Sequence, residues 1–193
     1  MRELIPKEAA SDLLQPYLPI MNQVMVASLN TLNNGLNAMD VSVNNRSKAT
    51  TFHSIAVEKT KKAFEEQSKI SLLPKYQSIQ IIFNGQMVGR IKKLNKKNFT
   101  SNASSSRNDM IVGQQLKLFK LPEITYIDLG YTIDPTWTSF EKLIVICRLN
   151  DEIKWELPFD DNSLEITLKT EPITIAPIQT ETQIKLKNAK GKL

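Results

Sequence analysis

The sequence predicts an α+β fold, in which two N-terminal helices pack on an antiparallel β-meander of about five to six strands and an extended C-terminal tail follows. Three observations predict it. Apolar residues recur every three or four positions over residues 7–39, which is the period of an amphipathic helix. From Ile79 onward the period switches to two, which is typical of strands. After Pro158, prolines and lysines indicate an extended chain.

The first helix is expected within residues 7–39. Pro16 and Pro19 interrupt its early part, so the continuous helix should begin near Pro19, because proline is tolerated in the first helical turn. Between Asp12 and Asp40 the segment carries no charged residue. Its apolar stripe is interpreted as a core face, with a face for a partner helix as the alternative. The stripe comprises Leu13, Leu14, Leu18, Met21, Val24, Met25, Leu29, Leu32 and Leu36.

A second helix is predicted from about Arg46 or Thr50 to Gln67, with Phe52, Ile55 and Phe64 on its apolar side. The segment 68–75, which contains Pro74, is expected to end it. Residues 1–45 are thus predicted to form an N-terminal helix, which either packs in the core or docks on a partner protein. Residues 46–160 are predicted to form the α+β core, and residues 161–193 the extended tail.

The strand region begins with a hairpin over residues 79–97. Asn84-Gly85 separates two alternating runs, and this dipeptide is the strongest short-range signal for a hairpin. Further strands are predicted at 114–121, 124–132, 142–150, 152–157 and 164–169, with a polar loop at 98–109. The strand at 142–150 is the most apolar and is expected at the centre of the sheet.

Charge is segregated along the chain. Residues 67–108 carry eight basic and no acidic side chains, whereas residues 121–171 carry eleven acidic and four basic ones. Such segregation can attract a polyanion to one surface, or it can make two segments of one fold attract each other. The chain has a net charge of +5, which favours the hypothesis of a polyanionic partner.

Few residues of the sequence are candidates for a catalytic role. The single cysteine, Cys147, lies in an apolar run and is interpreted as a buried side chain. His53 is the single histidine and is a weak candidate for acid–base catalysis. Asp128 and Asp134 flank Gly130-Tyr131, and two acids on neighbouring strand ends can bind Mg²⁺. A metal-dependent nuclease that uses them, with His53 or a lysine in support, is therefore the enzymatic alternative. Neither a glycine-rich phosphate loop nor a metal-ligand spacing is present, so no cofactor and no resident metal are expected.

The basic hairpin is the main candidate site. Several lysines or arginines on one surface are needed to contact a phosphate backbone, and the second strand of the hairpin with the following turn supplies them. The alternative is an edge strand that lysines protect from aggregation, or a surface that docks on an acidic protein. The candidate binding residues are Arg90, Lys92, Lys93, Lys96 and Lys97.

Several short motifs follow one another along the chain: Arg46 with His53, Lys62-Ala63-Phe64, Gly89 to Leu94, Leu129 to Asp134, and Ile153 to Leu157. This succession resembles a group of uncharacterised bacterial proteins carried on plasmids, prophages and genomic islands. Their genes often lie beside a helix-turn-helix regulator and a metallopeptidase-like protein. The resemblance covers residues 46–158 and implies a role in element maintenance, toxin–antitoxin function or defence, without assigning a catalytic residue.

The sequence therefore predicts a small non-enzymatic binding protein of a bacterial mobile element, which contacts nucleic acid or an acidic partner through the basic hairpin. The alternatives are the metal-dependent nuclease and a protein–protein interaction module that uses the uncharged N-terminal helix. A protein partner encoded nearby is a further hypothesis. No apolar run reaches the ~20 residues that span a bilayer, and residues 1–6 lack the apolar run of a signal peptide. A cytoplasmic protein with no membrane partner is expected, and the sequence leaves the oligomeric state open.

Overall fold

The computed structural model describes residues 4–75, 78–100, 124–149 and 152–159. These residues form three helices and six strands. The helices are α1 (Lys7–Leu14), α2 (Leu18–Met39) and α3 (Asn45–Phe64). The strands are β1 (Ile70–Lys75), β2 (Ser78–Phe83), β3 (Met87–Lys93), β4 (Thr125–Ile133), β5 (Phe140–Leu149) and β6 (Glu152–Pro158). The predicted α+β class is confirmed. The strands predicted at 114–121 and 164–169, and the tail at 161–193, lie outside the described residues.

The six strands form one sheet in the order in which they occur along the chain. Every neighbouring pair is antiparallel except β3 and β4, which are parallel and pair from Met87–Thr125 to Lys93–Tyr131. The sheet is therefore mostly antiparallel rather than a complete meander. The apolar strand β5 lies between β4 and the edge strand β6 rather than at the centre, although residues 143–147 are buried throughout.

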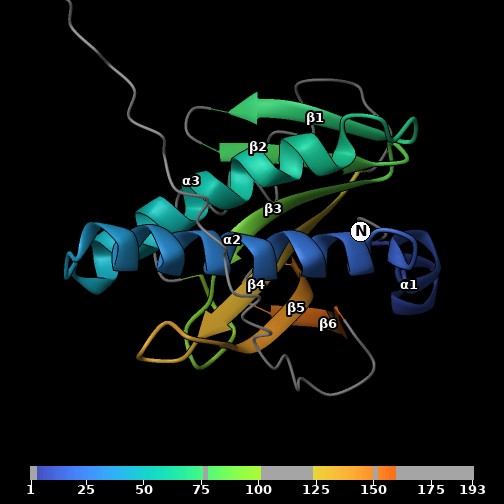
Figure 1. The fold of residues 1–193 in the computed structure, drawn as a ribbon. Coiled ribbons are helices and arrows are strands. Elements are labelled where there is room, and N and C mark those ends of the chain that lie inside the picture. The colour runs from blue at the N-terminus through green and yellow to red at the C-terminus, as the bar shows by residue number, and fades with distance from the viewer. Residues whose placement is uncertain (1–3, 76–77, 101–123, 150–151, 160–193) are drawn as a thin grey trace, which may run out of the picture.

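Helices α2 and α3 lie together across one face of the sheet (Figure 1). Their apolar stripes and the facing strand residues form one hydrophobic core, so the stripe of α2 is a core face as predicted. Met21, Met25 and Phe52 are completely buried in it. The break between α1 and α2 falls at residues 15–17, next to the two prolines, and the second proline stands in the first turn of α2.

Strand β1 corrects the prediction that residues 68–75 only end the second helix. It pairs with β2 from Ile70–Phe83 to Lys75–Ser78 and is an edge strand. An edge position tolerates Pro74, because one side of the strand needs no partner for its N–H groups. Ile70 and Leu72 pack against the core, which explains why this segment pairs with the sheet.

The hairpin predicted from Asn84-Gly85 is confirmed as the connection between β2 and β3. Both turn residues have positive φ, 50° for Asn84 and 69° for Gly85. Two positive φ values are what a type I′ turn requires, and asparagine followed by glycine meets that requirement at the least steric cost. The hairpin directs β3 across the sheet toward the end at which α3 begins.

The face of the sheet opposite the helices carries a smaller apolar cluster. Leu94, Ile144 and Ile146 are buried in it, and Ile153 packs against it. Gly130 makes the approach of Leu94 to β4 feasible, because a Cβ atom at position 130 would lie 2.4 Å from Leu94 Cδ1. Leu94 N also donates a hydrogen bond to Tyr131 O at 2.8 Å, so the chain after β3 is fixed against β4. We call this side the open face because neither α2 nor α3 covers it.

Candidate functional site

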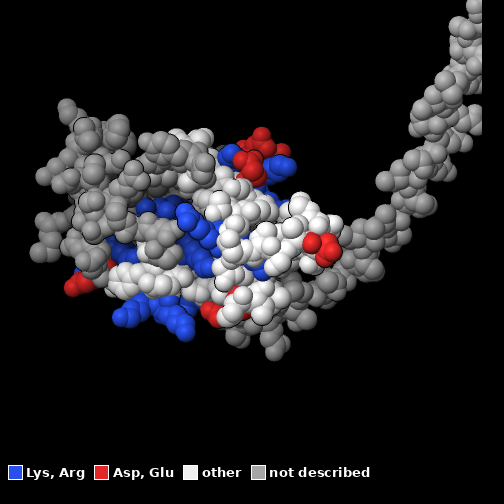
Figure 2. All heavy atoms as spheres, turned by 90° about the vertical axis from the view of Figure 1, so that its left-hand side faces the viewer, with Lys and Arg blue, Asp and Glu red and all other residues white. Residues whose placement is uncertain are grey.

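The parallel pairing of β3 and β4 gathers basic side chains at one end of the sheet. Strands β3 and β4 are parallel, so both end at the same end of the sheet. Strand β5 runs antiparallel to β4, so it begins at that end. The first turn of α3 and the turn after β3 reach the same end. Lysine and arginine side chains lie in the middle and along the lower margin of this end in Figure 2. We call this surface the basic end; it comprises Arg46, Lys48, Lys93, Lys96, Lys97 and Lys142.

Trp137 connects α3 to Lys93. Its indole ring lies under the Lys93 ammonium group, with Nζ 4.6 Å from the ring centroid. The Trp137 Nε1–H group donates to Asn45 Oδ1 at 3.1 Å, and Asn33 Nδ2 donates to Trp137 O at 2.9 Å. The ring is 1% exposed, and burial lowers the pKa of Lys93. These contacts fix the start of α3 beside the end of β3.

The turn that carries Lys96 and Lys97 is held by asparagine side chains. Asn95 Oδ1 accepts hydrogen bonds from the backbone N–H of Lys97 at 2.8 Å and of Phe99 at 3.0 Å. Asn98 Nδ2 donates to Glu156 Oε1 at 2.7 Å, and Asn98 Oδ1 accepts from Lys142 Nζ at 3.3 Å. The turn is therefore tied to β5 and β6, while Lys96 and Lys97 themselves are exposed.

Arg90 and Lys92 do not join the basic end, although the sequence grouped them with it. They lie on the open face, where Arg90 Nε donates to Asp128 Oδ1 at 2.7 Å. Arg148 Nη2 donates to Asp128 Oδ2 at 2.8 Å, so two guanidinium groups share one carboxylate. Burial lowers the pKa of Lys92, the charge of Arg90 lowers it further, and Asp128 opposes both effects. The predicted binding residues are thus divided between two adjoining surfaces.

The structure does not bring the predicted nuclease residues together. Asp128 binds the two arginines, while Asp134 lies six residues further along the chain, roughly 20 Å away in an extended strand. The Asp134 carboxylate accepts hydrogen bonds from Thr136, Thr138 and Ser139 and so closes the turn after β4. Desolvation would raise the pKa of Asp134, but these hydrogen bonds lower it to about 2.

His53 is half-buried on α3. Burial lowers its pKa, and the nearby charge of Lys92 lowers it further, so the neutral imidazole is favoured. Across the described parts of the chain, no three His, Cys, Asp or Glu side chains form a group that could hold a metal ion. Cys147 is completely buried, as its apolar run predicted.

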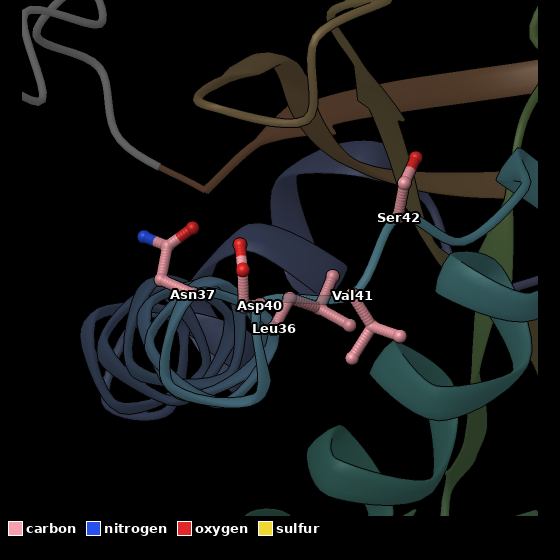
Figure 3. Close-up of a pocket in the computed structure, with 5 residues that line it drawn as sticks. All are labelled: Leu36, Asn37, Asp40, Val41 and Ser42. Carbon is pink, nitrogen blue, oxygen red and sulfur yellow. The ribbon is translucent and has the colours of Figure 1, made fainter.

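A shallow hollow lies where α2 turns toward α3. It is lined by Leu36, Asn37, Asp40, Val41 and Ser42. Figure 3 shows that Asn37, Asp40 and Ser42 extend toward the same side of the chain, whereas Val41 extends away from them. One carboxylate with an amide and a hydroxyl group offers no general acid–base pair, so we assign no catalytic role to this hollow.

Three of the basic-end residues were not predicted as site residues: Arg46, Lys48 and Lys142. The sequence did contain a signal for the first two. Both lie in the opening turns of a helix whose first turn has no acidic residue, although acidic residues are favoured there by the helix dipole. Lys142 and Arg148 gave no local signal, since only the strand register places Lys142 opposite Thr132 near the end of β4 and brings Arg148 close to Asp128.

Comparison with protein-family models, curated proteins and solved structures found no match. Within the described ranges, no helix combines the length and the apolar character that crossing a bilayer requires.

Proposed function

We propose that the protein is a small non-enzymatic nucleic-acid-binding protein that contacts the phosphate backbone through its basic end. The observation that carries this proposal is that the start of α3, the end of β3 with the following turn, and the start of β5 lie at one end of the sheet and together contain six basic residues. Phosphate contacts by several lysines and arginines supply most of the sequence-independent affinity for nucleic acid. The resemblance noted above adds the proposal of a role in maintenance, toxin–antitoxin function or defence for a bacterial mobile element. A cytoplasmic location is part of the proposal because the chain has one cysteine.

The local electrostatics favour an anionic partner at this end. Arg46 and Lys48 lie at the start of α3, where the helix dipole is already positive, so their charges are unfavourable there without an anion nearby. Asn44 caps the helix with a neutral side chain, accepting from Ser47 N at 2.9 Å. Asp134 and Glu141 also lie at this end, but the Asp134 carboxylate is occupied by the hydrogen bonds of its own turn.

The chemistry of the exposed groups favours nucleic acid over an acidic protein. The turns after β3 and β4 expose Asn95, Lys96, Lys97, Thr136 and Thr138. Ammonium, amide and hydroxyl groups are the side chains that bind phosphate oxygens. A protein partner would instead favour an apolar centre surrounded by polar residues.

Binding at several salt concentrations tests the proposal. The full-length protein is titrated into labelled duplex DNA, single-stranded DNA and RNA, in parallel with the Lys96→Gln/Lys97→Gln variant. The matched control is Lys62→Gln/Lys69→Gln, which removes two exposed lysines near the end of α3 and beyond it. If each lysine contacts one phosphate, the slope of log K against log salt decreases in magnitude by about 2 in the first variant only.

Two results would overturn the proposal. One is the absence of binding to all three probes at ~0.1 M salt, where contacts to several phosphates still give measurable affinity. The other is an equal loss in both variants, because that would show an effect of net charge alone. Shortening of the probe in the presence of Mg²⁺ would instead support the nuclease alternative.

A further inference from the structure

Trp137 has a backbone conformation that tryptophan rarely adopts. Its φ is 65°, which lies in the left-handed region that favours glycine. Such a conformation persists only where surrounding contacts hold it, and residues of this kind cluster at functional sites. Here both helices of the core supply contacts. Asn33 of α2 donates to Trp137 O at 2.9 Å, and the Phe52 ring of α3 lies 6.3 Å from the indole, centroid to centroid. The fold therefore holds the Trp137 side chain in one position beside the basic end.

The indole N–H group of Trp137 fixes the orientation of the Asn45 side chain. An indole N–H can only donate a hydrogen bond, and this one donates to Asn45 Oδ1 at 3.1 Å. The amide oxygen of Asn45 therefore faces the indole, and the amide NH2 group points away from it. Asn45 is exposed, and its NH2 group donates to no described residue. A buried side chain thus sets the direction of a hydrogen-bond donor at the surface.

The same indole also positions the Lys93 ammonium group. Lys93 Nζ lies over the ring, 4.6 Å from its centroid, and takes part in no salt bridge between described residues. Asn45 Oδ1 accepts from the ring edge, so the ammonium and amide groups are roughly 6–7 Å apart. Hydrogen bonds of about 2.8 Å to two oxygens of one phosphate group span a similar distance. The two donors can therefore contact a single phosphate group.

We propose that Lys93 and Asn45 form a subsite for one backbone phosphate of a nucleic acid, and that Trp137 is its positioning residue. Phosphodiester oxygens only accept hydrogen bonds, which suits an ammonium group beside an amide NH2 group. Burial lowers the pKa of Lys93, and the same partial burial strengthens a contact with an anion because less water competes. This inference rests on the proposed function. It adds a contact that depends on geometry to the contacts of Lys96 and Lys97, which depend on charge.

A neutral substitution separates this subsite from the effect of charge. The full-length protein and each variant are titrated into labelled duplex DNA, single-stranded DNA and RNA at several salt concentrations. Asn45→Ala should weaken binding about fivefold at every salt concentration, because one hydrogen bond to phosphate is lost. The slope of log K against log salt should stay unchanged, since no charge is removed. Asn34→Ala, which removes an exposed amide group of α2, is the matched control and should bind like the wild type.

A double variant tests whether Lys93 and Asn45 contact the same phosphate. Lys93→Gln/Asn45→Ala should lose less affinity than the product of the two single losses, because residues that share one partner are coupled. Lys96→Gln/Asn45→Ala should lose the full product, because these residues contact different phosphates. Full products in both double variants would overturn the shared subsite.

Trp137→Phe tests the positioning role, because it keeps a ring beneath Lys93 and removes the N–H group that orients Asn45. It should weaken binding about as much as Asn45→Ala does, and Trp137→Phe/Asn45→Ala should bind no more weakly than Asn45→Ala alone. A further loss in this double variant would overturn the positioning role. Urea unfolding checks that each variant is folded, and the Asn45 and Lys93 variants decide the inference if Trp137→Phe does not fold.

The outcomes distinguish this inference from the proposed function. If Asn45→Ala binds as tightly as the wild type while Lys96→Gln/Lys97→Gln has a reduced salt slope, the subsite is overturned and the proposed function stands. If the wild type binds none of the three probes, both are overturned.

Discussion

Replacing Asp128 with asparagine should destabilise the fold, because two largely buried guanidinium groups depend on this carboxylate. Both contacts are short, 2.7 Å from Arg90 and 2.8 Å from Arg148. Breaking a buried ion pair costs about 3–5 kcal/mol, whereas exposed pairs contribute at most about 1 kcal/mol. With exposures of 9–16%, the site is close to the buried case, and we expect a loss of about 3 kcal/mol. For a chain of this size, Tm should fall by about 6–12 °C.

Urea-induced unfolding followed by tryptophan fluorescence measures this loss. Trp137 and Trp155 are both buried, so unfolding exposes both indole rings to water. Glu58→Gln is the control, because it breaks an exposed pair with Lys61 and should leave the midpoint nearly unchanged. If Asp128→Asn lowers stability no more than this control does, the two ion pairs of Asp128 with Arg90 and Arg148 do not stabilise the fold as argued here.

Three further predictions concern single positions. Gly130→Ala should cost about 1–3 kcal/mol in urea unfolding, because the new Cβ would lie 2.4 Å from Leu94 Cδ1; an unchanged midpoint would contradict this packing. Asn44→Ala should cost about 1 kcal/mol through loss of the cap on Ser47 N, and a serine at position 44 should restore most of it. His53 has a folded-state pKa below its unfolded value, so the unfolded state binds more protons and stability should fall as pH drops below about 6.5. His53→Gln should reduce that pH dependence of Tm, and an identical dependence in wild type and variant would refute the assignment.

The features predicted correctly from the sequence were those with local causes. Asn84-Gly85 specifies its turn by its own backbone preferences, and the helical stripe of α2 follows from a period that needs no partner to be recognised. Strand β1 is not predicted from the sequence, because Pro74 at this position indicates the end of a helix. A proline is also compatible with an edge strand, and the sequence alone does not show which strands lie at an edge.

The arrangement of the site depends on contacts between residues that are far apart in the chain. Arg90 and Asp128 belonged to competing hypotheses, a phosphate-binding hairpin and a metal-dependent nuclease, yet they are separated by 38 residues and form one ion pair. The charge segregation did leave open an attraction between two segments of one fold, and this pair is an instance of it. Only the parallel register of β3 and β4 brings the two side chains together.

The most direct test of the central claim is an NMR titration of the isotope-labelled protein with an oligonucleotide. If the basic end is the binding surface, the backbone amide signals of residues 45–48, 95–98 and 136–139 should shift together with one dissociation constant. The Trp137 indole N–H, which bonds to Asn45, should shift with them. Shifts confined to β1 and the end of α3, with these three segments unchanged, would contradict the account.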